Sequence, residues 1–444
     1  MQWRSCALLI ILGPSISAIG QVAPTATGED APFVSESQMM TPPPVNGATY
    51  PNVAGEDVRT NYMAAEFRTD VAYTDNVLPT LTAKPVSDYN YSVYPTVSFN
   101  RTTPRDQATF IYSPAITFYK QTSALDTVNQ AANLNIQNHL SRHLAISVRD
   151  LFIRTSDVFN QPYPLTAGGI SGLPGAVPGV IVPFTMQLSN VANAAMTWQF
   201  ARDAMIGVGG SHFLFKLHNR GQGTGLDNSG GEGVQAFYSR RLTSMRYSGV
   251  AYDFERTTFS PTSGPVEIDT QTFLPFYSYY FNPQSSVSIS AGAAHIDATQ
   301  AQHSAFTGWR PTAVVSFGWQ GLRSNVAASY QYTIIEGDGL AGAFTSNGVT
   351  AAGSVKLNRM WTAVVSMSYA DLEAAAQLAA LTGRGRTFAA QVSLEQQIST
   401  RLTARIGYDR LHESFNGISA IAPNPNIDSA FVSVAYAFRK PMGR

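Results

Sequence analysis

The ten residues from Ser429 to Phe438 limit the fold more than any other stretch, because their two faces differ chemically. Apolar residues alternate with small ones, Val432, Val434, Tyr436 and Phe438 against Ser433, Ala435 and Ala437. Side chains two residues apart lie on the same face of a β-strand. The spacing therefore predicts a strand with one apolar face and one face of small or polar side chains.

The same alternation returns from Tyr62 to Phe438, in units of a strand, a short polar turn, a second strand and a longer loop. The short turns are expected at residues 102–106, 139–143, 201–203, 241–245, 282–285, 321–325, 358–359 and 397–401. These hairpins, with a first and a last strand, predict about eighteen strands of roughly ten residues, the length that crosses a bilayer at a tilt. Sixteen or twenty strands would also fit the pattern.

Composition favours a chain whose surface meets lipid. Charged residues make up 13% and aromatic residues 11% of the 444 residues, whereas soluble domains carry about 25% charged residues. The formal net charge is zero, so the chain lacks the basic footprint of a nucleic-acid-binding protein. Three tryptophans, Trp198, Trp319 and Trp361, lie close to the short turns, as a girdle at the membrane interface requires.

Taken together, these patterns resemble the bacterial outer-membrane β-barrels, including porins, and the strand ending at Phe438 resembles their closing strand. The resemblance implies an all-β, antiparallel up-and-down barrel in outer-membrane lipid of a Gram-negative-type envelope, with short periplasmic turns and long outer loops. It also implies that the barrel-assembly machinery reads the last strand, which pairs with the first. Here Arg439 to Arg444 follow the aromatic residue, whereas in the family an aromatic residue usually ends the chain.

The two ends of the chain differ from the rest. Residues 1–20 carry Arg4, an apolar core from Cys6 to Leu12 and small residues before a cut after Gly20, which predicts a cleaved secretory signal peptide. Residues 21–57 are rich in proline and are expected to form a disordered periplasmic leader, or else a tether or plug. We expect the barrel at 58–440 and a short tail at 441–444. Cys6 is the single cysteine, so no disulfide or thiolate metal site is expected in the mature chain.

A barrel of about eighteen strands is too wide for its own side chains to fill. Seven charged residues are expected to face this lumen as pore-lining residues, Glu66, Arg68, Asp70, Arg149, Lys356, Glu395 and Arg405. They could select solutes at a constriction or simply pair across a wet wall. Asp150 breaks the pattern, because alternation directs it toward lipid. Either a bulge or a strand end near the headgroups would relieve this.

The longest loop, from Thr155 to Phe184, is apolar and rich in glycine and proline. Resemblance to porins suggests a constriction loop that folds into the barrel, marked by Gly168, Gly172, Pro174 and Pro178. The alternative is that it packs over the rim or contacts neighbouring molecules. The segment from Asp371 to Leu381 is rich in alanine and leucine and is expected to form a short helix.

The function that these expectations favour is an outer-membrane porin-like channel for passive or weakly selective passage of small polar solutes. The alternatives are a gated transporter of a hydrophobic or polymeric substrate, and a non-conducting surface protein that binds a partner through its outer loops. No Gly-x-Ser-x-Gly elbow is present, and we expect no enzyme activity, no cofactor, no metal site and no nucleic-acid partner. The sequence does not indicate the solute or the oligomeric state.

Overall fold

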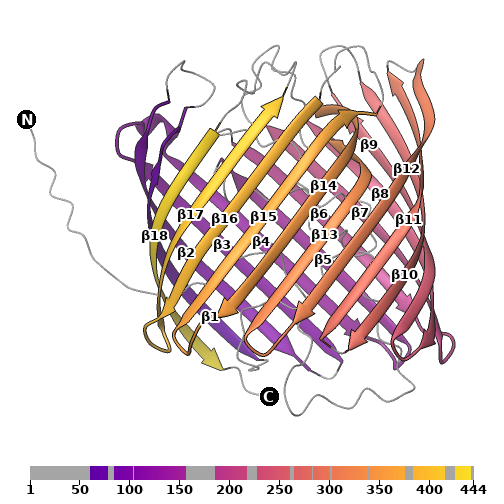
Figure 1. Ribbon diagram of the computed structural model, residues 1–444, viewed down its shortest axis with the longest axis horizontal. Coiled ribbons are helices and arrows are strands. Elements are labelled where there is room, and N and C mark those ends of the chain that lie inside the picture. Colours follow the sequence, from indigo (N-terminus) through magenta and orange to yellow (C-terminus); the bar gives the residue numbers. More distant parts are fainter. Residues whose placement is uncertain are drawn as a thin grey trace, which may run out of the picture.

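The computed structural model describes residues 61–78, 85–103, 105–156, 186–217, 228–260, 265–282, 284–300, 303–337, 340–375, 384–415 and 426–441. These residues form one sheet of 18 strands (Figure 1). The strands are β1 (Tyr62–Thr74), β2 (Asp88–Thr102), β3 (Asp106–Tyr119), β4 (Thr127–His139), β5 (Leu144–Thr155), β6 (Gln187–Trp198), β7 (Ala204–Leu217), β8 (Ser229–Thr243), β9 (Arg246–Phe259), β10 (Val266–Asn282), β11 (Ser285–Gln300), β12 (His303–Gln320), β13 (Ser324–Gly337), β14 (Leu340–Lys356), β15 (Trp361–Ala374), β16 (Arg384–Gln397), β17 (Leu402–Phe415) and β18 (Asn426–Pro441). A single 3-10 turn, η2 (Ser123–Leu125), lies between β3 and β4.

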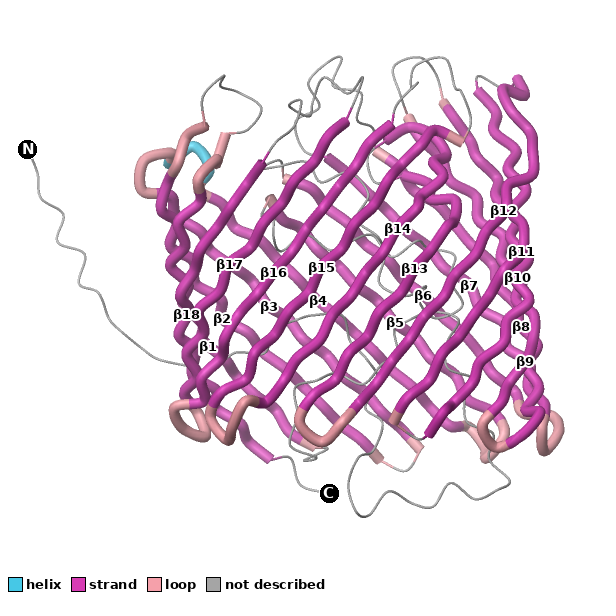
Figure 2. Tube along the Cα trace, in the orientation of Figure 1, coloured by secondary structure: helices cyan, strands magenta, loops and turns pink. Residues whose placement is uncertain are grey.

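The sheet closes on itself. Each strand pairs antiparallel with the next along the chain, and β18 returns to pair with β1 from Thr74 opposite Ser429 to Tyr62 opposite Pro441. Figure 2 shows the resulting single wall of tilted strands. The fold is an up-and-down β-barrel of 18 strands, which confirms the predicted fold class and strand number.

The two rims of the barrel differ. Eight short connections, between β2 and β3 and then between every second pair up to β16 and β17, lie at the rim where β1 starts and β18 ends. Most connections at the other rim are longer. The connections from β11 to β12 and from β13 to β14 are exceptions, because these strands extend further at the long-loop rim. β12 has 18 residues and β14 has 17. The even strand number places both barrel termini at the short-turn rim.

The outward face of the wall is apolar. Along β18, Val432 and Phe438 are 52% and 53% exposed, whereas Ser433 and Ala435 between them are buried. The large exposed side chains of the other strands, such as Tyr73, Phe118 and Ile406, share this outward face. Closure leaves no open sheet edge in hydrocarbon, and a largely apolar outward face suits lipid rather than water. The barrel is therefore a transmembrane one.

The helix expected from Asp371 to Leu381 was wrong where the structure describes it. Asp371 to Ala374 continue β15, paired with Phe344–Asn347 of β14 and, through Asp371, with Arg386 of β16. Asp371 also forms ion pairs with Arg384 (2.6 Å) and Arg386 (3.7 Å). Cross-strand pairing thus overrides the local helix propensity of alanine and leucine.

Several sequence-based expectations lie outside the described residues. These are the signal peptide, the leader, the constriction loop with Gly168, Gly172, Pro174 and Pro178, the part of the expected helix beyond Ala375, and residues 442–444 of the tail. In the part of the chain that the structure describes, no helix has the length and apolar character needed to cross a membrane.

The ends of β13 and β14 bend inward, away from the barrel wall. Pairing between β12 and β13 runs from Gln320 opposite Asn325 only to Ala313 opposite Tyr332, although both strands continue further. Beyond this point β13 and β14 remain paired with each other. They also contact β9 and β10, which are not their neighbours in the sheet. We call residues 333–337 with 340–345 the mouth hairpin, because this tip folds inward near the long-loop rim.

Candidate functional site: the inner wall

Four of the predicted pore-lining residues lie on one row of the sheet. Lys356 stands opposite Thr362, and Thr362 opposite Glu395. Glu395 stands opposite Arg405, which is opposite Ser433, and Ser433 is opposite Asp70. Alternation places all six side chains on the inward face, so cations and carboxylates alternate across β14 to β1.

Arg68 lies beside this row. Its Nε is 3.2 Å from Oδ1 of Asp70, and both side chains are only 15% exposed. Its guanidinium carbon stacks over the ring of Tyr94, 3.9 Å from the ring centroid. Glu66, two residues earlier on β1, is also buried on the inward face. An arginine held by a carboxylate on one side and an aromatic ring on the other has few alternative orientations.

Arg405 repeats this arrangement on β17. Its guanidinium carbon is 5.2 Å from the centroid of Phe431 on β18, and the residue is 8% exposed. Both arginines are therefore fixed to the wall by aromatic rings from the neighbouring strand. Such fixed charges set the local electrostatic potential at the inner wall.

Two further carboxylates of this region were not among the predicted residues. Asp409 and Glu413 share the inward face of β17 with Arg405 and are buried. Thr387 of β16 donates a hydrogen bond of 3.5 Å to Oε1 of Glu413. The signal was present, since both lie an even number of residues from Arg405. We call the inward charges of β14 to β1 the charged arc, with five carboxylates and four cations, Glu66, Asp70, Glu395, Asp409, Glu413, Arg68, Lys356, Arg405 and Arg439.

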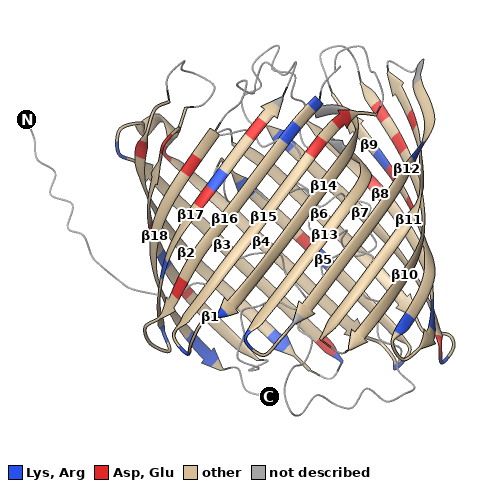
Figure 3. Ribbon diagram, viewed as in Figure 1, with Lys and Arg blue, Asp and Glu red and all other residues tan. Residues whose placement is uncertain are grey.

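Arg149 does not belong to the charged arc. It lies on the inward face of β5 between Asn135 and Asn193, four strands from β1 in the sheet order. The inward charges Asp253 and Glu255 on β9, and Arg310 on β12, were also not predicted. In Figure 3 charged residues are sparse at mid-height and concentrate toward the two rims.

The wall from β10 to β15 is polar but almost uncharged. One row across it consists of hydroxyl residues, Ser278, Ser288, Ser316, Ser329, Thr350 and Ser368. Neighbouring hydroxyls are 2.8 Å apart between Ser278 and Ser288 and 2.6 Å apart between Ser329 and Thr350. This hydroxyl wall carries no charge and can both donate and accept hydrogen bonds, although all of its members except Thr350 are buried.

Near the mouth, the inner wall becomes apolar. Phe259, Val266, Ile268, Ala294, Ile296 and Ala298 form a buried cluster, completed by Ile334 and Ala343 from the mouth hairpin and by Ala375. The amide of Ala375 donates to the carbonyl oxygen of Ala343 (2.9 Å), and Nη2 of Arg310 donates to the carbonyl oxygen of Ala375 (3.0 Å). Sequence analysis missed this cluster because it joins strands that are not neighbours in the sheet.

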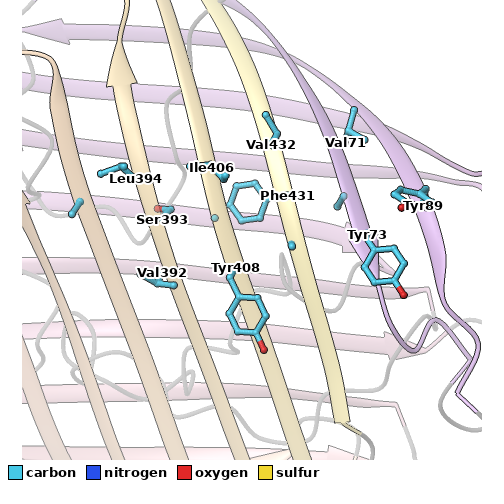
Figure 4. A pocket seen from close by; sticks show the side chains of 14 residues that line it. Val71, Tyr73, Tyr89, Val392, Ser393, Leu394, Ile406, Tyr408, Phe431 and Val432 are labelled. Atoms are coloured by element: carbon cyan, nitrogen blue, oxygen red, sulfur yellow. The ribbon is translucent and has the colours of Figure 1, made fainter.

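An outward groove of about 740 Å³ crosses the seam where β18 meets β1. Its lining includes Val71, Tyr73, Tyr89, Val392, Ile406, Tyr408 and Val432 (Figure 4). The small Ala430 stands opposite both Tyr73 and Tyr408, which leaves the space between the two rings. The groove faces lipid, not the lumen, and its apolar lining suits an acyl chain rather than a polar solute.

Asp150 faces outward at mid-strand. It is the seventh of the 12 residues of β5, and pairing with β4 and β6 runs through it without a shift in register. Neither a bulge nor a strand end therefore relieves its position. Its Oδ1 instead accepts a hydrogen bond from Nδ2 of Asn190 on β6 at 2.7 Å.

The described residues contain no group of three or more histidine, cysteine or acidic residues placed to hold a metal ion. The arrangement offers charges, hydroxyls and stacked rings along a lumen. What it can do chemically is to exchange hydrogen bonds and charge interactions with polar groups.

No protein-family model matches the sequence, and the comparison with curated proteins finds no match. Among solved structures, Pseudomonas aeruginosa OccK2 in complex with glucuronate is 8% identical, with a TM-score of 0.42 over 85% of this chain and 98% of that chain. Acinetobacter baumannii OccAB4 is 10% identical, with a TM-score of 0.40 over 86% of this chain and 100% of that one. Pseudomonas aeruginosa OpdK with vanillate is 10% identical, with a TM-score of 0.40 over 85% and 99%. Likeness at this level carries no argument about function.

Proposed function

We propose that the protein is a porin-like channel of a bacterial outer membrane, for the passive or weakly selective passage of small polar solutes. The observation that carries the proposal is the contrast between the two faces of one closed wall. The outward face is an apolar belt, and the inward face holds the charged arc and the hydroxyl wall. A wall of 18 strands encloses an interior too wide for its own side chains to fill.

The charged arc supports weak rather than strong selectivity. Its five carboxylates exceed its four cations by only one charge, and opposite charges alternate along the row. A hydrated cation is therefore favoured slightly over an anion. The hydroxyl wall would interact with solutes of either sign.

Single-channel recording tests the proposal. The purified chain is reconstituted in planar bilayers, and steady conductance steps are expected. Under a salt gradient, the reversal potential is expected to show a small preference for the cation. Silence in the intact chain that is relieved by deletion of residues 168–183 would favour a plugged, gated barrel instead. Silence in both would contradict a channel.

A gated transporter is the second candidate, and the mouth hairpin is the observation that favours it. This tip lays Ile334 and Ala343 on the apolar cluster of β9 to β11. A hairpin that lies against the inner face near the mouth narrows the entrance. It could move away from this face when a substrate binds. A conductance that appears only when the hairpin packing is weakened would favour this candidate over the open channel.

A further inference from the structure

The outward face of β5 to β7 carries polar side chains in the middle of the strands. Asp150 lies at mid-strand and is hydrogen bonded to Asn190. His212, the ninth of the 14 residues of β7, stands opposite Ala192 on the same face and is exposed. A carboxylate and an amide that face hydrocarbon are unfavourable there, and such groups generally pair with other protein groups.

The residues around these polar groups are small. Ala132, Ala192, Ala194 and Gly210 share this outward face. A Cβ added at Gly210 would find only the carbonyl oxygen of Gly233, at 3.6 Å. Small side chains at membrane depth let another protein backbone approach closely. We call this face the polar sector, and it comprises Ala132, Asp150, Asn190, Ala192, Ala194, Gly210 and His212.

Aromatic residues avoid the same part of the wall. The outward faces of β4 to β7 carry two, Phe152 and Trp198. The three strands β1 to β3 carry eight, Phe67, Tyr73, Tyr89, Tyr91, Phe99, Phe110, Tyr112 and Phe118. Aromatic side chains collect where a barrel meets lipid headgroups. A gap in this girdle that coincides with polar and small residues indicates a face that does not meet lipid.

The charges of this region complement one another. Exposed Arg154 and Lys216 stand at the outer ends of β5 and β7, and exposed Glu232 stands opposite His212 on β8. With Asp150, the surface thus offers both acidic and basic groups within four neighbouring strands. A surface that carries both partners of an ion pair can bind a copy of itself, as the interfaces of symmetric homo-oligomers do.

We propose that the polar sector is an interface between copies of this chain, so that the barrel assembles as a homo-oligomer in the membrane. Asp150 and His212 would then meet groups of a neighbouring barrel instead of lipid. The small residues would set the close approach of the two walls. This inference does not depend on whether the lumen conducts.

Cross-linking in membranes tests it. In a chain with Cys6→Ser, Ala192→Cys introduces a thiol in the polar sector, and Ala430→Cys introduces one in the lipid-facing groove as the matched control. After treatment with a bifunctional maleimide, the Ala192→Cys protein is expected to give products at whole multiples of the chain mass. The Ala430→Cys protein is expected to remain at the monomer mass. Equal cross-linking of both, no product from either, or an Ala192→Cys adduct that is not a multiple of the chain mass would overturn the proposal.

A second variant separates assembly from folding. Asp150→Arg replaces the central carboxylate with a cation, and the oligomer seen by native mass spectrometry is expected to fall to monomers. The barrel fold is followed in the same sample by its resistance to unfolding in unheated detergent gels. A folded Asp150→Arg barrel that keeps the full oligomer mass contradicts the proposal. If this variant fails to fold, Ala192→Leu, which only blocks the close approach, replaces it with the same expected outcome.

Discussion

The guanidinium carbon of Arg68 lies 3.9 Å from the centroid of the Tyr94 ring, directly across the β1–β2 pair. Asp70 holds the same guanidinium from its own strand at 3.2 Å. The cation is thus fixed on the inner wall rather than carried on a mobile side chain. A fixed charge contributes to ion selectivity through its position as well as its sign.

Arg68→Gln should therefore make the channel more cation-selective. The substitution changes the charged arc from five carboxylates and four cations to five and three. The reversal potential in a salt gradient should shift toward that of the cation, and the measurement is made on single channels in planar bilayers. Thr69→Ala changes the neighbouring outward residue of β1 and should leave the reversal potential as it was. An unchanged value in Arg68→Gln would mean that solutes do not pass the charged arc.

Glu395 and Arg405 face each other across β16 and β17, and their single substitutions should act in opposite directions. Glu395→Gln should reduce cation preference, because it removes a carboxylate from the row. Arg405→Gln should increase it. The double variant should return close to the parent reversal potential, since its net charge is the same. A shift of the same sign in both single variants would contradict a purely electrostatic contribution.

Weakening the mouth hairpin should change the entrance and not the barrel. Ile334 is buried in the apolar cluster, and truncation of a buried isoleucine typically costs about 2–5 kcal/mol. That loss should fall on the local packing of the tip, because β13 is not paired with β12 beyond Tyr332. Ile334→Ser should therefore raise single-channel conductance or its fluctuation and increase protease cleavage near residues 338–339.

Val326→Ala is the matched control for this prediction. It truncates a lipid-facing residue in the part of β13 that is paired with β12. Its conductance and its protease pattern should match those of the parent chain. If Ile334→Ser also behaves like the parent in both measurements, the mouth hairpin does not restrict the entrance.

Period-two alternation was sufficient to predict most of the wall. In a closed barrel the face of each residue follows from its parity along the strand, so Val432 and Ser433 could be assigned to opposite faces without knowledge of their neighbours. The same logic placed Arg68, Glu395 and Arg405 on one surface. That Glu395 and Arg405 share one row, with Arg68 on the row beside it, depends on the register between strands, which the sequence does not indicate.

Features that depend on contacts between distant strands could not be predicted in this way. The mouth hairpin packs through a cluster that joins Ile334 with Phe259 and Ile268, and these residues are far apart in the sequence. The helix expected after Asp371 failed for a related reason, since Arg384 and Arg386 on the next strand hold that segment in the sheet. Alternation did direct Asp150 outward. Its significance depends on the small residues beside it and on the scarcity of aromatic residues on the outward faces of β4 to β7.

The β17–β18 pair, next to the seam that closes the barrel, provides the last prediction. Gly407 on β17 stands opposite Phe431 on β18, and a Cβ added at Gly407 would lie 2.4 Å from Cζ of Phe431 and 2.9 Å from the carbonyl oxygen of Val392. The ring can rotate away, but the carbonyl oxygen belongs to the β16 backbone and cannot. Gly407→Val should therefore destabilise the barrel by about 1–3 kcal/mol, the usual cost of overpacking. The urea midpoint for loss of the folded band in unheated detergent gels measures this change.

Phe431→Ala added to Gly407→Val should restore only part of the lost stability. Gly230→Ala, where an added Cβ has its nearest neighbour at 3.4 Å, should keep the parent midpoint. A parent-like midpoint in Gly407→Val would show that the side chains around Gly407 are packed more loosely than these contacts require.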